Sequence, residues 1–362
     1  MKELLLFVLP AIIFFLVFSS FAQLSGGFAV FTGLLLFLVC MSNFAAVITS
    51  YPVGFFAQNF IVSPNHIQQQ EMQELEAVYT LNLAPICDNS TALIIGLLLG
   101  IYVSVKKIES LKSFANKGSD IVNFFLSKIF TPVLPIFILG FILKAQHSGL
   151  LEILFKNFVP LLSVILCLYV IYIGLFYLIV NEFSISKSIS AVKNILSPAI
   201  VGFCSMSSAA AMPAMIQGTI RNAQDEAIPK KIIPFITNTH MMGDALAIPL
   251  MAMSLYIVEY QHFPAIEEYV IFAISYVLAK FASAGIPGGT ILIMTPVLES
   301  KLGFTSEMSS IILTTYLLFD PFCTMGSILG NGGFTIMFEK LKSKIMLPKP
   351  VIPESTKTAS DI

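Results

Sequence analysis

Long apolar runs recur along this 362-residue chain, and most approach or exceed the roughly 20 residues that a helix needs to cross a bilayer. They are Leu4–Phe21, Phe28–Ala57, Leu93–Val105, Ile121–Leu143, Phe158–Val180, Ile232–Val258, Tyr269–Phe281 and Ile311–Ile328. Only 11% of the residues are charged, whereas an ordinary soluble domain has about 25%. A β-barrel would instead show short alternating segments. The chain is therefore predicted to be an all-α polytopic membrane protein.

Three apolar segments in the C-terminal half are interrupted by polar residues, glycine or proline. The interruptions are Ser205–Pro213, Ser283–Thr290 and Asp320–Asn331. Lipid offers no hydrogen bonds, so backbone that leaves a helix at membrane depth must be bound by protein, water or a ligand. Broken helices of this kind are typical of the binding sites of secondary transporters. We interpret the first two interruptions as tips of re-entrant helical hairpins that enter from opposite sides of the membrane.

Charge and cysteine content exclude several other classes of protein. Basic residues cluster at 106–117, 187–193, 221–231 and 340–349, and a cytoplasmic position for all four clusters satisfies the positive-inside rule. The net charge of -1 gives no indication of nucleic-acid binding. The five cysteines have no metal-binding spacing, and they are interpreted as buried thiols. Without a Ser/His/Asp set, an HExxH motif or a CxxC pair, we expect no enzyme and no cofactor.

Three ionisable residues stand out inside the apolar segments: His240, Asp244 and Asp320. Charged groups at bilayer depth are costly, so function is the default interpretation and a polar helix–helix contact is the alternative. His240 and Asp244 are four residues apart, which places both on one face of a helix. They could form an ion pair that exchanges a proton, or a neutral histidine could donate a hydrogen bond to the carboxylate. Gly243 and Pro249 predict that this helix is locally unwound.

The order of these motifs resembles the dicarboxylate/amino acid:cation symporter family, which has the glutamate-transporter-like elevator fold with two re-entrant helical hairpins. The motifs are the serine-rich tip, His240-Met-Met-Gly-Asp-Ala-Leu246, Gly285-Ile-Pro-Gly-Gly289 and Asp320-x-x-x-Thr-Met-x-Ser327. The resemblance implies scaffold and trimerisation spans mainly in 1–120, linking spans in 121–180, and a transport domain in 181–345 that slides against the scaffold. A disordered cytoplasmic tail is expected over 346–362. One span that usually comes first in the family is missing, which would place the N-terminus outside.

The resemblance also assigns substrate-binding roles, residue by residue. Ser207 and Ser208 match the serines that hold the substrate α-carboxylate, and Asp320 matches the aspartate that pairs with its amino group. Thr324 matches a threonine beside that aspartate. Gly285, Ile286, Pro287 and Gly288 match the second hairpin tip, which acts as the extracellular gate.

Several positions depart from the family pattern. Cys323 stands in place of an arginine that grips a side-chain carboxylate, and Asp244 replaces a threonine that faces the substrate side chain. Met242 and Asn331 replace two sodium-binding aspartates, and Ser327 replaces an asparagine. The predicted substrate-binding set therefore also includes Asp244, Cys323 and Ser327, and the coupling-ion candidates are Ser42, His240, Asp244, Ser327 and Asn331.

These departures predict a changed substrate and a changed coupling ion. A neutral polar or cationic amino acid fits better than an acidic one, and the coupling cation is H⁺ or Na⁺, with H⁺ preferred because sodium favours carboxylate ligands. The expected partners are an amino-acid substrate, membrane lipid and two further copies in a homotrimer. We expect a multi-pass protein of the plasma membrane, the inner membrane of a bacterium. The alternatives are a dicarboxylate or glutamate symporter, a channel, or a non-transporting sensor on the same fold.

Overall fold

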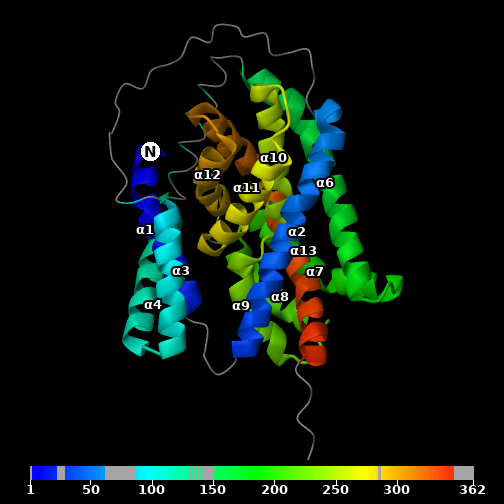
Figure 1. Cartoon of the computed structure of the whole chain (residues 1–362). Helices are drawn as coiled ribbons and strands as arrows, with labels where there is room; N and C mark the ends of the chain where they lie inside the picture. Colours follow the sequence, from blue (N-terminus) through cyan, green and yellow to red (C-terminus); the bar gives the residue numbers. More distant parts are fainter. Residues whose placement is uncertain are drawn as a thin grey trace, which may run out of the picture.

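The computed structural model describes residues 2–22, 29–61, 87, 89–130, 133, 136, 139, 143, 150–283 and 287–345. Within these ranges, every regular element is a helix (Figure 1). The elements are α1 (Lys2–Ala22), α2 (Ala29–Ile61), α3 (Asn89–Lys106), α4 (Glu109–Phe124), the π-helix η1 (Phe125–Phe130), α6 (Leu150–Val180), α7 (Ile185–Ser205), α8 (Ser208–Ile220), α9 (Ala227–Thr239), α10 (Met242–Tyr260), α11 (Ile266–Ala279), the 3₁₀-helix η2 (Lys280–Ala282), α12 (Gly289–Leu302) and α13 (Ser306–Ile345).

Five helical segments among the described residues are long and apolar enough to cross a membrane. They are Phe31–Phe60, Val159–Val180, Ile185–Ser205, Ala227–Tyr260 and Ser306–Ile345. Shorter apolar helices cover Pro10–Ala22 and Ile94–Lys106. The predicted all-α membrane architecture is confirmed.

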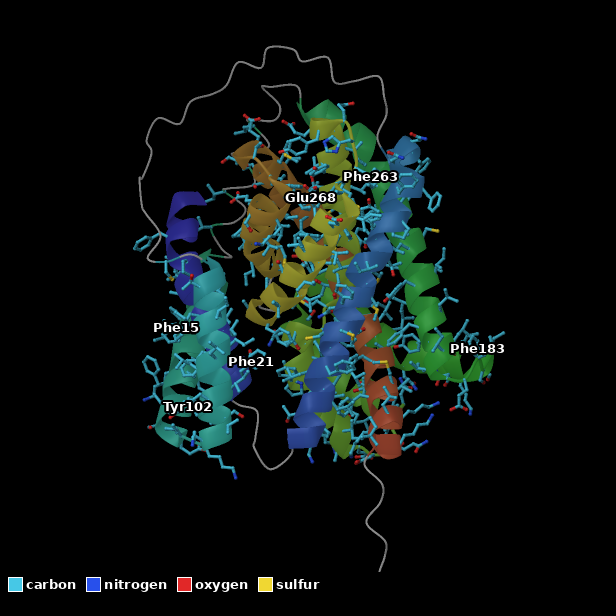
Figure 2. The ribbon with its side chains drawn as sticks, in the orientation of Figure 1. Phe15, Phe21, Tyr102, Phe183, Phe263 and Glu268 are labelled. Atoms are coloured by element: carbon cyan, nitrogen blue, oxygen red, sulfur yellow. The ribbon has the colours of Figure 1, made fainter. Side chains whose placement is uncertain are left out.

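Helices α1, α3 and α4 form a separate group beside the rest of the bundle (Figures 1 and 2). Ser19 on α1 donates to Asn116 on α4 at 3.0 Å, and the ring of Phe15 packs edge-on against Phe114 with centroids 5.7 Å apart. This group contacts the larger bundle through Phe21, whose ring lies 5.2 Å from that of Phe281 in η2, and through Ile12 and Leu16, which cluster with Leu292 in α12. A packed aromatic contact therefore joins the first helix to the second hairpin.

Helix α2 belongs to the larger bundle by its packing, although it lies early in the chain. It contacts α10 and α11, and Tyr269 on α11 donates to the carbonyl of Val47 at 2.7 Å. Tyr51 donates to Pro264 O at 3.0 Å. The assignment of 1–120 mainly to a scaffold remains a prediction, and α2 lies in that range although it packs against the C-terminal half.

The first two interruptions in the sequence separate helices. Helices α7 and α8 pack against each other and meet at Met206, which has a left-handed backbone (φ 51°), and at Ser207, which caps α8. The second interruption follows η2, and Gly288 (φ 69°) caps α12. Gly285 and Ile286 lie outside the described residues, as does the tail 346–362. Figure 1 draws α8 toward one end of the bundle and α11 and α12 toward the other.

The third predicted interruption is wrong. Residues Asp320–Asn331 lie inside α13, which continues from Ser306 to Ile345 with Pro321 in its interior. The glycines here serve helix packing. An added Cβ would clash with Tyr169 at Gly326, with Met242 at Gly330 and with Tyr177 at Gly332. Small residues that let helices approach closely explain this part of the sequence without any unwinding.

Candidate functional site

Helices α9 and α10 are separated by a break in the buried interior. His240 (φ -108°, ψ 87°) and Met241 (φ -114°, ψ 75°) leave the helical conformation between them. Side chains of α2, α6, α11 and α13 bind the backbone around the break, as polar backbone at membrane depth requires. The bonds are Asn43 Nδ2 to Thr239 O (2.8 Å), Tyr169 OH to Gly243 O (2.9 Å), Tyr276 OH to Asp244 O (3.0 Å), Ser50 Oγ to Leu246 O (2.8 Å) and Gly243 N to Ser327 Oγ (3.1 Å).

Gly243 allows α10 to touch α13 directly. An ideal Cβ on Gly243 would overlap the carbonyl oxygen of Cys323 and would lie 2.8 Å from the backbone nitrogen of Ser327. Both obstacles are backbone atoms, which cannot move aside as a flexible side chain can. Glycine is therefore required here by close approach, and this contact places the next residue, Asp244, against α13.

His240 connects the break to α2 and α13. Its Nδ1 lies 2.7 Å from Asn331 Oδ1, and its Nε2 lies 2.8 Å from Ser42 Oγ. The imidazole also packs on the Phe334 ring, with centroids 4.3 Å apart. Nearby amide atoms Asn331 Nδ2 and Asn43 Oδ1 are buried without a hydrogen-bond partner among the described residues. The structure thus brings together Ser42, His240 and Asn331 from the predicted coupling-ion set.

The predicted contact between His240 and Asp244 is absent. The i,i+4 rule applies within a continuous helix, and the break at His240 and Met241 turns the two side chains toward different partners. Ser327, another coupling-ion candidate, accepts from Gly243 N and has 1% of its surface exposed. Asp244 lies in a separate cluster, so the candidates for coupling do not form one site.

Asp244 is paired with a lysine that the sequence interpretation missed. Lys280 Nζ lies 3.1 Å from Asp244 Oδ2, and the lysine side chain is completely buried. Thr290 donates to the same carboxylate oxygen at 3.0 Å, and Tyr316 donates to Asp244 Oδ1 at 2.8 Å. These partners come from η2, α12 and α13. The pair is an ionic contact that joins the second hairpin to α10.

Asp320 lies one step further along the same network. Its Oδ2 accepts from the backbone N–H of Gly288 at 2.7 Å, and its Oδ1 accepts from Thr324 Oγ1 at 3.2 Å. The Tyr316 hydroxyl lies 3.2 Å from Asp320 Oδ1, so it stands between the two aspartates. One phenolic hydrogen serves one acceptor at a time, and the shorter distance favours Asp244. Asp320, 3% exposed, therefore fixes the described side of the second hairpin tip to α13.

The first hairpin approaches the same part of α13. Gly202, one turn before the tip, packs so closely that an added Cβ would lie 3.1 Å from Thr324 Cγ2. Phe203 packs edge-on against Phe322, with ring centroids 5.1 Å apart. At the tip, Ser207 accepts a hydrogen bond from Ala210 N at 3.2 Å, and Ser208 opens α8 as a buried residue. Thr324 and Asp320 thus lie on the α13 segment between the two hairpins.

Comparison with known proteins now decides the family. The sequence profile of the sodium:dicarboxylate symporter family matches residues 1–341. The chain belongs to this family. It is a multi-pass membrane protein of the transport class, in which cation-coupled symport is the family activity. No curated protein matches the chain.

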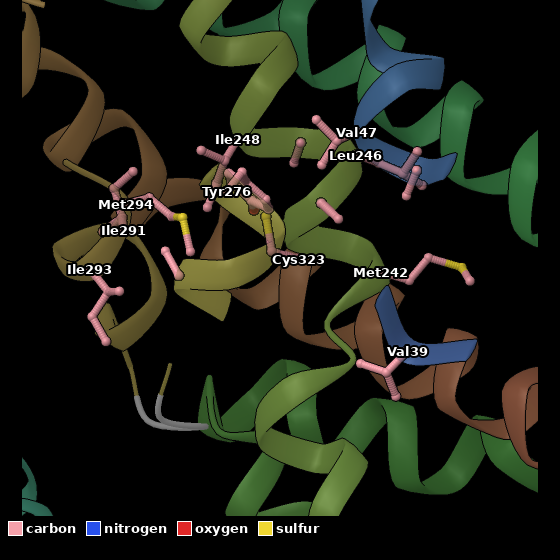
Figure 3. Packing of buried hydrophobic residues seen from close by; sticks show 14 of the residues in the cluster. Val39, Val47, Met242, Leu246, Ile248, Tyr276, Ile291, Ile293, Met294 and Cys323 are labelled. Atoms are coloured by element: carbon pink, nitrogen blue, oxygen red, sulfur yellow. The ribbon is translucent and has the colours of Figure 1, made fainter. Parts of the chain in front are cut away.

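Two departures from the family pattern lie in the apolar core of this symporter. Cys323 is fully buried in the same apolar cluster as Tyr276, and Figure 3 draws the two close together. Met242 is 1% exposed and contacts Gly330. Neither residue contributes a charge, so the sites at which the resemblance expects an arginine and a carboxylate are neutral here.

Sequence reasoning missed Lys280, Tyr316 and Thr290, which are the three side-chain partners of Asp244. Lys280 had a clear signal, because it lies inside the apolar run Tyr269–Phe281 next to the second interruption. Tyr316 had none, since a hydroxyl in an apolar segment is common, and Thr290 lies at the end of the second interruption, where only the fold brings it to the carboxylate. Pro287 is half-buried beside Gly288 at the described edge of the tip.

Proposed function

We propose that this symporter carries a neutral polar amino acid across the membrane with a coupling cation. The observation that supports this most directly is Asp320, a buried carboxylate on α13 that accepts from Gly288 N at 2.7 Å and adjoins Thr324. A substrate ammonium group is a stronger donor to a carboxylate than a neutral N–H, since charge-assisted hydrogen bonds are about twice as strong. Asp320 is therefore suited to bind an amino group.

The first hairpin offers the complementary group for the substrate carboxylate. The N-terminus of α8 begins at Ser208 with Ser207 as its cap. Backbone N–H groups and the helix dipole at an N-terminus favour an anion. An amino acid placed between the hairpins would direct its carboxylate to Ser207 and Ser208 and its amino group to Asp320.

Neutral side chains are favoured over both charged classes. Cys323 supplies no positive charge for a second substrate carboxylate, and Asp244 already pairs with Lys280 at 3.1 Å. A cationic substrate was expected because Asp244 would otherwise lack a positively charged partner. The pairing with Lys280 supplies that partner, so this reason no longer applies. Serine, threonine and cysteine fit the remaining neutral environment best.

Protons are our proposed coupling ion. Ser42, His240 and Asn331 form a hydrogen-bonded chain without a carboxylate, in which His240 and Asn331 are buried and Ser42 is half-buried. Hard cations such as Na⁺ prefer several oxygen ligands, whereas imidazole readily gains and loses a proton. Uptake into proteoliposomes should therefore proceed under an inward pH gradient without sodium. Strict sodium dependence would contradict this part of the proposal.

We further propose the elevator mechanism, in a homotrimer located in the inner membrane of a bacterium. Packing of α1, α3 and α4 as a group apart from the α7–α13 bundle supports a scaffold and a mobile unit. Cross-linking of engineered cysteines placed in α1 and η2 should trap one position of the bundle and stop uptake.

Binding of radiolabelled serine to the purified protein tests the proposal. Asp320→Asn should abolish binding, because the amide cannot form the ion pair. Asp120→Asn, at an exposed position of α4, is the matched control and should bind normally. If aspartate displaces serine more effectively than threonine or cysteine does, the proposed substrate class is wrong. Counter-flow of labelled serine would separate a carrier from a channel.

A further inference from the structure

Lys280 is the one lysine that is buried among the residues whose exposure the structure describes. The side chain is 0% exposed and lies in η2, at the end of the first arm of the second hairpin. A charged group at membrane depth is costly, so it persists where a partner and a role retain it. The partner is Asp244, and the pair has no assigned role in the proposed transport cycle.

The contacts of Lys280 join three elements. Its Nζ lies 3.1 Å from Asp244 Oδ2 on α10 and 3.5 Å from Met241 Sδ in the α9–α10 break. Thr290 on α12 reaches both of these acceptors, at 3.0 Å and 3.2 Å. The ring of Tyr276 lies 5.5 Å below the ammonium group. The lysine thus occupies the point at which hairpin, broken helix and α12 meet.

The acceptors around this point suit an ammonium ion better than a metal cation. Asp244 supplies one carboxylate oxygen, and the hydroxyls of Thr290 and Ser283 lie beside it and act as donors, Thr290 to Asp244 Oδ2 and Ser283 to Met241 Sδ. The remaining acceptor is the Met241 thioether, a soft ligand that Na⁺ does not favour. The Tyr276 ring adds a cation–π contact. Asp244 nevertheless requires a positive charge, because a buried carboxylate without one is strongly unfavourable.

We propose that the Lys280 ammonium group is a tethered cation that takes the place of one dissolved cation in this symporter. A sodium ion, the coupling ion after which the family is named, binds from solution and can dissociate again. The Lys280 ammonium group is part of the chain and cannot leave. This position therefore neutralises Asp244 and fixes the hairpin to α10 without drawing on the sodium gradient. The consequence for transport rests on the proposed carrier function, whereas the test below needs no substrate.

The test measures melting temperature of the purified full-length protein in NaCl and in choline chloride at equal ionic strength, without amino acid. Lys280→Ser replaces the ammonium group with an oxygen ligand and leaves Asp244 unpaired. Its melting temperature should be low in choline and should rise with sodium concentration. Lys187→Ser, at an exposed position of α7, is the matched control and should show the small sodium response of the wild type.

A double variant separates a sodium site from general fragility. Lys280→Ser with Asp244→Asn has no unpaired charge, so sodium should give it no added stability. A folded Lys280→Ser protein that gains nothing from sodium would overturn the proposal. If Lys280→Ser does not fold in either salt, the sodium responses of the wild type and of the double variant are compared instead. Equal sodium responses in the two support the tethered cation, and a sodium-specific stabilisation of the wild type that the double variant lacks refutes it.

The two proposals can fail independently. If sodium did not stabilise Lys280→Ser, the proposal that the protein binds serine would be unaffected, because the melting experiment contains no amino acid. Absence of serine binding would overturn the proposed substrate and would leave the sodium response of Lys280→Ser as it was measured.

Discussion

Substitution of Gly243 by alanine should be one of the most destabilising changes of a single methyl group in this protein. The added Cβ would overlap the Cys323 carbonyl oxygen and would lie 2.8 Å from Ser327 N and 3.0 Å from Cys323 C. Overpacking of a dense interior costs about 1–3 kcal/mol. Separation of α10 from α13 would also stretch the hydrogen bond from Gly243 N to Ser327 Oγ, which contributes about 0.5–1.5 kcal/mol. We therefore expect Gly243→Ala to lower the free energy of unfolding by about 2–4 kcal/mol.

Gly174→Ala provides the matched control. Gly174 lies in α6, and a Cβ added there would meet no atom within 4 Å. Because alanine is the better helix former, this substitution should raise the free energy of unfolding by about 0.5–1 kcal/mol. Unfolding both variants with SDS in mixed detergent micelles, followed by circular dichroism, gives the comparison. Equal effects of the two substitutions would refute the close-approach argument.

Two further predictions concern ionic contacts. Lys280→Met and Asp244→Asn should each lower the free energy of unfolding by about 3–5 kcal/mol, while the double variant recovers most of the loss; additive effects in the SDS assay would contradict a direct pair. The pKa of exposed Glu182, in the loop before α7, is lowered first by the hydrogen bond from Lys340 and then by the lysine charge. The contact therefore stabilises the folded state at pH values above the unfolded-state pKa of Glu182. This stabilisation is lost as the pH falls through the folded-state pKa. Lys340→Met should raise the Glu182 pKa toward its ordinary value, as measured by NMR of ¹³C-labelled glutamate, and an unchanged pKa would show that the contact does not persist in solution.

Apolar length and interruption were sufficient to predict the helical membrane fold and the first two breaks. They failed at Asp320–Asn331, because glycine has two uses that look the same in sequence. At Gly288 the backbone adopts a positive φ, whereas Gly326 and Gly330 admit Tyr169 and Met242 while remaining helical. The difference depends on what packs against the residue, and the neighbouring residues in the chain do not record it.

Spacing rules failed at the site for a related reason. His240 and Asp244 are one helical turn apart in sequence, yet the break between α9 and α10 directs one to Asn331 and Ser42 and the other to Lys280. Lys280 is 36 residues away from Asp244 along the chain, so no local pattern connects them. A lysine inside an apolar run was nevertheless visible, and it predicts that a buried carboxylate must exist elsewhere.

The charges of the site limit which amino acids it can accept. Lys280 neutralises Asp244. In the proposed binding mode, Asp320 pairs with the substrate amino group and the α8 N-terminus receives the substrate carboxylate. A neutral amino acid therefore leaves no unpaired charge, whereas an acidic or cationic side chain adds one. An unpaired charge at membrane depth costs about 2.5–3.5 kcal/mol on insertion scales, which corresponds to about 60- to 300-fold in affinity. Competition against labelled serine should show lysine and aspartate both weaker than threonine by about this factor, and comparable affinity for either charged amino acid would show that the charges are arranged differently when substrate binds.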